Sequence, residues 1–239
     1  RQHDPATCHP IGRPIAVESL RETRAAAALA LEGRSPRPRR EDLAKIAAAP
    51  PEARRAAQAA ERRAWDQALG LGRGELAQWR LLGLGQWRMW HDRIARQPKT
   101  TPPASALGRI QALIRDPRGR DAVMATAFAG AGECPRQLAL GLGGLAVLDP
   151  ATSGGLNQAA ALAALDLLTR TLGHVAPRRR GPGLALGAAW HWWNGSGAEA
   201  SEWAESSLEC PNAPELAGIV ATLVRHGVFP ITVRQAASN

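Results

Sequence analysis

The sequence predicts an all-α protein, an irregular multi-helix bundle in which two helical subdomains are expected. Alanine and leucine, both strong helix formers, are abundant along the whole chain. Tyrosine is absent, phenylalanine occurs only twice, and β-branched residues are sparse except near the C-terminus. With 239 residues, the chain is long enough to bury a substantial core without disulfide bonds.

The N-terminal subdomain is expected to cover residues 1–97. Its first helix is predicted over about residues 15–31, where apolar side chains recur on one stripe. The following segment, 33–40, combines two prolines with four arginines, which predicts an exposed basic linker and not a packed element. A short helix is expected over 41–49.

A longer helix is predicted over 51–69, because Pro51 and Glu52 form a favourable helix start. The glycines between positions 70 and 74 are expected to separate it from a second helix, and both helices are expected to bury tryptophans. A nucleobase-stacking platform is the alternative interpretation of these tryptophans. The charged residues on the exposed side of the first helix are expected to be Arg54, Arg55, Glu61, Arg62 and Arg63.

The C-terminal subdomain is expected to cover residues 104–239, after a proline-rich linker at 97–103. Ser105 is predicted to cap its first helix, since serine at this position can bind the free N–H groups of a helix start. The pair Asp116-Pro117 is expected to end that helix.

The rest of this subdomain alternates apolar helices with polar breaks. Residues 178–183 are predicted to form a second basic loop, and the run 228–233 is expected to be an extended tail packed on helices. Helices are predicted over 106–115, over 119–129, from Cys134 to about 149, over 157–172 and over 214–226.

The formal charge of +9 comes almost wholly from arginine, because Lys45 and Lys99 are the only lysines. A basic surface attracts nucleic acid, anionic membranes or acidic proteins, so each of these is a candidate partner. A GC-rich genome would produce the same arginine bias without selection for binding. No apolar stretch approaches the length of a transmembrane segment.

Several common chemistries lack their sequence motifs. The three cysteines, Cys8, Cys134 and Cys210, have no Cys-x-x-Cys spacing, and no cofactor or metal site is expected. The chain has no Gly-x-Ser-x-Gly elbow and no phosphate-binding Gly-x4-Gly-Lys-Ser/Thr loop. The second absence excludes nucleotide hydrolysis by the P-loop route, and the first leaves serine hydrolase chemistry without its sequence motif.

Cys134 is the candidate catalytic residue. Pro135 suits the first helical turn, so Cys134 is expected at the cap of the helix that follows. The positive end of that helix, together with Arg136, would favour the thiolate over the thiol. The alternative interpretation is a small apolar residue that fills the core.

The stretch from Trp90 to Leu145 resembles the catalytic domain of the NEL ("novel E3 ligase") family of bacterial secreted ubiquitin ligases. The resemblance rests on the run Trp90-His-Asp-Arg-Ile94, an apolar helix, the charged run Arg115-Asp-Pro-Arg-Gly-Arg120 and Phe128 before Cys134. That family has aspartate and arginine two and three residues after its cysteine. This chain has Arg136 and Gln137 there, and Glu133 and Asp149 are the nearest acids.

The resemblance implies a bacterial effector secreted into a host cell. Cys134 would accept ubiquitin from a conjugating enzyme as a thioester and pass it to a substrate lysine. The alternative is a non-enzymatic basic helical scaffold or adaptor in the bacterial cytoplasm, or a structural subunit of a large assembly. Such a protein would bind an acidic protein or nucleic acid.

Overall fold

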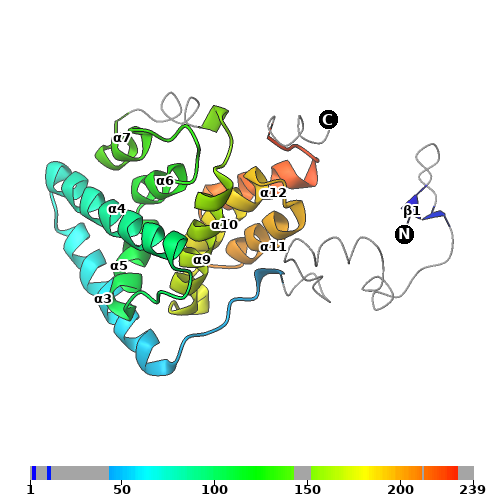
Figure 1. Ribbon diagram of the computed structural model, residues 1–239. Helices are drawn as coiled ribbons and strands as arrows, with labels where there is room; N and C mark the ends of the chain where they lie inside the picture. The colour runs from blue at the N-terminus through cyan, green and yellow to red at the C-terminus, as the bar shows by residue number, and fades with distance from the viewer. Residues whose placement is uncertain (1, 4–9, 12–42, 143–151, 212, 231–239) are drawn as a thin grey trace. The chain divides into compact units, whose positions relative to one another are not determined.

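The computed structural model describes residues 2–3, 10–11, 43–142, 152–211 and 213–230, and most of the regular structure in these ranges is helical (Figure 1). The predicted all-α fold class is confirmed. No helix in the described ranges combines the length and the apolarity that a bilayer span requires.

The chain divides into two units, Arg1–Leu43 and Ala44–Asn239. In the described part of the first unit, β1 (Gln2–His3) pairs with β2 (Pro10–Ile11) as a short antiparallel ladder. The predicted helix over 15–31 and the predicted linker at 33–40 lie outside the described residues.

The second unit begins with a segment that is not helical. Residues 43 and 44 form a single 3-10 turn and residues 45–50 have no regular structure, so the predicted helix over 41–49 is wrong for its described part. The Ala49 N–H donates to Gly173 O at 2.9 Å, which connects this segment to the last residue of α9 (Gln158–Gly173). The prolines at 50 and 51 also disfavour helical conformation in the residue before each of them.

Two long helices follow, α3 (Pro51–Leu69) and α4 (Arg73–Arg96). The prediction that two helices meet at the glycines between 70 and 74 is therefore confirmed. The expected exposure of Glu61 is wrong: its side chain lies on the buried stripe of α3 together with Ala57, Ala60, Ala64 and Ala68.

A single aspartate separates α5 (Ala104–Arg115) from α6 (Pro117–Ala125). Asp116 ends α5, as predicted, and its carboxylate accepts a hydrogen bond from Gly119 N at 2.8 Å, which caps α6. Ser105 is not the cap of α5, because the helix begins at Ala104, two residues earlier than expected, and Pro103 stands at the cap position. The predicted helix over 119–129 starts two residues earlier than expected and ends at Ala125.

The helix after the cysteine, α7 (Cys134–Leu140), has only seven residues. It was expected to continue to about 149. Gly141 ends it in the left-handed region at φ +79°, a conformation that glycine adopts without steric cost, and the next side chain, Leu142, is exposed. Residues 143–151 lie outside the described residues.

The last described helices are α9 (Gln158–Gly173), a 3-10 helix over Pro177–Arg179, α10 (Gly181–Trp193), α11 (Gly197–Leu208) and α12 (Glu215–Arg225). Helix α11 was not predicted, because glutamates and serines interrupt its apolar pattern. Its buried face consists of Ala200, Trp203, Ala204 and Ser207.

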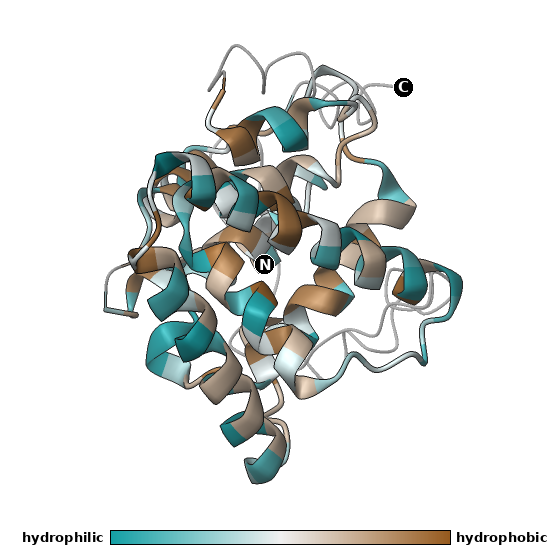
Figure 2. Cartoon of the chain, turned by 90° about the vertical axis from the view of Figure 1, so that its left-hand side faces the viewer, coloured by the Kyte–Doolittle hydropathy of each residue, from teal (hydrophilic) through white to brown (hydrophobic). Residues whose placement is uncertain are grey.

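Helix α10 lies at the centre of the second unit, where it contacts α5, α6, α9, α11 and α12. Glycines allow this close packing. A Cβ at Gly187 would clash with the ring of Trp203, and a Cβ at Gly183 would lie 2.6 Å from Leu172 Cδ2. Figure 2 shows hydrophobic and hydrophilic residues alternating along the helices, as expected for helices that bury one face.

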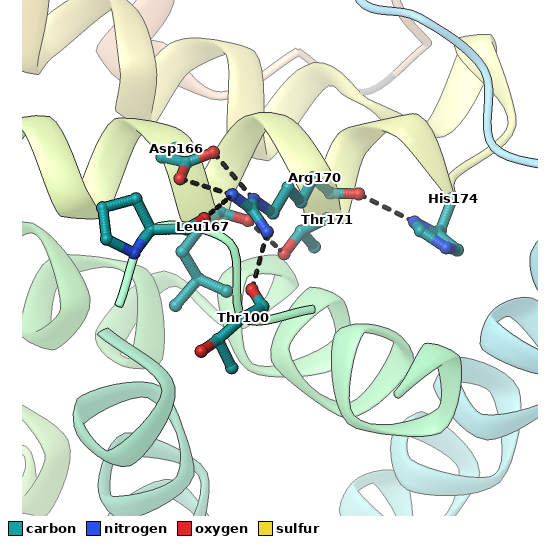
Figure 3. Close-up of polar contacts among 7 residues, drawn as sticks. Thr100, Asp166, Leu167, Arg170, Thr171 and His174 are labelled. Atoms are coloured by element: carbon teal, nitrogen blue, oxygen red, sulfur yellow. Dashed lines mark hydrogen bonds and ion pairs between the residues drawn. The ribbon is translucent and has the colours of Figure 1, made fainter. Parts of the chain in front are cut away.

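The predicted subdomain boundary between 97 and 104 does not divide the second unit. Helix α3, before it, packs closely on α5, after it, and α4 contacts α9. The linker itself is held by Arg170 of α9 (Figure 3), which donates to Thr100 O at 2.7 Å and to Pro98 O at 2.6 Å. Asp166 orients this guanidinium through two further contacts of 2.8 Å.

Candidate functional site

Cys134 lies at the first residue of α7 and its side chain is buried, with 6% of the residue exposed. The neighbouring charges face solvent: Arg136 Nη1 lies 3.6 Å from Glu133 Oε2, and both side chains are more than half exposed. The expected stabilisation of the thiolate is wrong, because burial raises the pKa of the Cys134 thiol. A catalytic role for Cys134 stays a prediction.

Alkylation at controlled pH tests this environment. Iodoacetamide reacts with the thiolate, so a raised pKa and burial predict slower alkylation of Cys134 near pH 7.5 in the folded protein than in the same protein in denaturant. Mass spectrometry of a Cys8→Ser/Cys210→Ser variant follows Cys134 alone. Faster alkylation in the folded protein would instead indicate an activated thiolate.

A second group of candidate side chains lies elsewhere, around a cavity of about 490 Å³. We call it the arginine cavity. Four separate segments supply its lining: α3, the end of α5, the chain around the start of α10, and the chain after α11. The lining residues are Trp65, Arg115, Arg178, Arg179, Pro182 and Pro211.

A buried carboxylate organises two of these arginines. Glu61 is 1% exposed, and its Oε1 accepts a hydrogen bond from Arg179 Nη2 at 2.7 Å. Arg115 Nη1 lies 3.5 Å from the same oxygen. Burial raises the pKa of Glu61, while the charges of Arg179, Arg115 and Arg62 act in the opposite direction. Glu61 therefore holds in place two of the arginines that line the cavity.

Trp65 fixes Arg115 from another side. The Arg115 guanidinium carbon lies 4.1 Å from the centre of the Trp65 ring, a cation–π contact. Burial lowers the pKa of Arg115, and Glu61 opposes that change. The guanidinium is thus held between an aromatic face and a carboxylate, which reduces the entropy that it would lose on binding an anion.

Arg178 differs from its neighbours because it is exposed and has no ion-pair partner among the described residues. It lines the arginine cavity and also a second cavity of about 290 Å³ beside the start of α10. That second cavity contains Arg180, Glu209 and Cys210 in its lining. Burial raises the pKa of the Cys210 thiol, as it does for Cys134.

The sequence predicted a basic loop over 178–183, but Arg178 and Arg179 lie in the 3-10 helix and residues 181–183 begin α10. The sequence also predicted that the helix over 51–69 buries its tryptophan, whereas Trp65 is only half-buried. Neither prediction connected these residues with one another. Glu61 and Arg115 were not recognised as partners of the predicted loop. One signal was available: Glu61 stands at the helical spacing of Ala57, Ala64 and Ala68, so it falls on a stripe of small apolar residues. An acidic residue on such a stripe needs a buried cation.

Comparison of the chain with protein-family models, with curated proteins and with solved structures finds no match. Its function must therefore be inferred from its own side chains.

Proposed function

We propose that this chain is a non-enzymatic helical adaptor whose arginine cavity binds an acidic segment of a partner protein. The observation that carries the proposal is the convergence of Arg115, Arg178 and Arg179 on one cavity whose only described acidic neighbour in contact is Glu61. Guanidinium groups bind carboxylates through paired N–H donors. The volume of the cavity lies within the range of ordinary ligand pockets.

The shape of the site favours a protein segment over nucleic acid. Proteins that bind nucleic acid without sequence preference usually place cations along a groove, where they neutralise successive phosphates. Here the cations converge on one cavity. The Trp65 ring already carries Arg115 on one face, so that face is unavailable for stacking on a base.

Apolar groups beside the arginines suit the remainder of such a segment. Trp65, Pro182 and Pro211 line the same cavity and offer van der Waals contact to main-chain and aliphatic atoms of a peptide.

Three predictions from the family resemblance stay predictions: catalysis of ubiquitin transfer through Cys134, secretion into a host cell, and a ubiquitin-conjugating enzyme as partner. The Cys134 thiol is buried and its pKa is raised, so its surroundings add no support to them.

Peptide binding measured by fluorescence anisotropy tests the proposal. A labelled peptide rich in glutamate is expected to bind, whereas the same peptide with glutamine at every glutamate position is not. Arg178→Ala is expected to weaken binding by about tenfold, because one charge-assisted contact is lost. Arg136→Ala is the matched control, since Arg136 is an exposed arginine that does not line the cavity.

Two outcomes would contradict the proposal. One is equal binding of the glutamate and glutamine peptides. The other is tight binding of single-stranded DNA that Arg178→Ala does not weaken, which would indicate a nucleic-acid surface elsewhere on this basic chain. Circular dichroism of each variant confirms that the helical fold is retained.

A further inference from the structure

The charge balance of the arginine cavity identifies the kind of acidic residue that fits it best. Arg115, Arg178 and Arg179 contribute three positive charges, and an ionised Glu61 contributes one negative charge. Asp66 acts electrostatically on Arg115 and Arg62 acts on Glu61, and because these two have opposite charges, the site still keeps two positive charges. A carboxylate side chain would neutralise one of them, whereas a phosphate monoester carries about −1.5 to −2 charges at pH 7.

The hydrogen-bond donors of the cavity lead to the same ligand. Glu61 is reached by Nη2 of Arg179 and by Nη1 of Arg115, so each guanidinium keeps further N–H groups beyond that contact. Arg178 has all of its donors available, because no described residue pairs with it. Three guanidinium groups match the three terminal oxygens of a phosphate better than the two oxygens of a carboxylate.

The size of the cavity indicates that the phosphate is attached to a larger molecule. A cavity of about 490 Å³ holds much more than one phosphate group, and the remaining wall is formed by Trp65, Pro182 and Pro211. These rings offer apolar contact to the residues on either side of a modified side chain. A short peptide segment would fill this space.

We propose that the arginine cavity binds a phosphorylated serine or threonine side chain within a partner segment. This inference rests on the proposed function, because it specifies the acidic residue of the segment that the adaptor binds. Glu61 is a positioning residue in this site: it holds Arg179 and Arg115 before the ligand arrives and touches no part of it. Arg178 is the cation that becomes paired only when the phosphate binds.

Three labelled peptides that differ at one central position test this inference. The position holds serine, glutamate or phosphoserine, and anisotropy is measured at one pH and one salt concentration. The phosphoserine peptide is expected to bind at least about tenfold more tightly than the glutamate peptide, since the second negative charge meets the unmatched arginine. The serine peptide is expected to bind most weakly.

Variants of Arg178 show whether this side chain is responsible for the tighter binding of the phosphoserine peptide. Arg178→Ala is expected to remove most of the difference in affinity between the phosphoserine and glutamate peptides. Arg178→Lys is expected to keep only part of that difference, because lysine has the charge but not the planar guanidinium group. Arg136→Ala should leave the difference unchanged. Arg178 is exposed, so these changes do not disturb the core.

The outcomes separate this inference from the proposed function. Equal affinity for phosphoserine and glutamate peptides would overturn the phosphate assignment and leave the acidic-segment adaptor intact. Binding of neither peptide would overturn both. Competition by inorganic phosphate at the same concentration as the phosphopeptide would show a site for small anions and would also overturn the inference.

Discussion

Replacing Asp116 by alanine is expected to lower the free energy of unfolding by about 3–5 kcal/mol. Asp116 and Arg80 are both buried and form a two-pronged pair, with Nε–Oδ1 at 2.6 Å and Nη2–Oδ2 at 2.9 Å. The variant leaves the Arg80 guanidinium buried without its carboxylate. It also removes the hydrogen bond from Gly119 N that caps α6. Urea unfolding followed by far-UV circular dichroism measures the loss.

Two companion variants identify the cause of this loss. Arg80→Met/Asp116→Ala removes both charges, so its loss should be smaller than that of Asp116→Ala alone. Glu133→Ala breaks the exposed pair with Arg136, and we expect a change within about 0.5 kcal/mol. A loss below about 1 kcal/mol for Asp116→Ala would show that water reaches Arg80 and that the pair is not buried in solution.

The second large effect is expected for Trp87→Ala, a loss of about 3–5 kcal/mol in the free energy of unfolding. Trp87 of α4 is fully buried and stacks on Trp190 of α10, with ring centres 6.0 Å apart. Its Nε1 donates to Thr126 Oγ1 at 3.1 Å. The substitution therefore leaves a large cavity between two helices. Urea unfolding by circular dichroism is again the measurement, since the change removes a fluorophore.

Trp87→Phe distinguishes the two contributions of this side chain. Phenylalanine keeps an aromatic ring in the core but cannot donate to Thr126, so we expect a smaller loss than for alanine. Equal losses for the two variants would assign the effect to the hydrogen bond and not to the ring volume.

The secondary structure was predictable where local chemistry sets it. Pro51 and the glycine at 70 bound α3 as expected, and Asp116-Pro117 ends α5 as expected. The predictions failed where a distant group decides the outcome. Residues 45–50 are not helical, and Ala49 N–H binds the distant Gly173 O in addition to the local effect of Pro50 and Pro51. Helix α11 forms although glutamates and serines interrupt its apolar pattern in the sequence.

In the candidate site, too, the features that depend on nearby residues were predictable and those that depend on distant residues were not. The cluster of arginines at 178–180 was visible in the sequence, although it lies in a 3-10 helix and at the cap of α10 and not in a loop. Cys134 was predicted at the cap of its helix, but Glu133 holds that position and Cys134 is the first helical residue. The burial that raises the pKa of Cys134 was not visible, because it depends on helices that pack over α7. The value of a cysteine as a nucleophile is set by its surroundings in three dimensions more than by its place at a helix start.

Sequence by itself determined the all-α fold, the ends of helices such as α3 and the excess of arginine, because these depend on residue type and on neighbours within a few positions. Tertiary structure alone decided that Arg179 meets Glu61, which lies 118 positions earlier, and that Arg115 and Trp65 complete the same cavity. The physical reason is that a buried carboxylate pairs with whichever cation lies beside it once the helices have packed. The periodicity of a helix shows which of its faces is buried, but it does not show which other helix packs against that face.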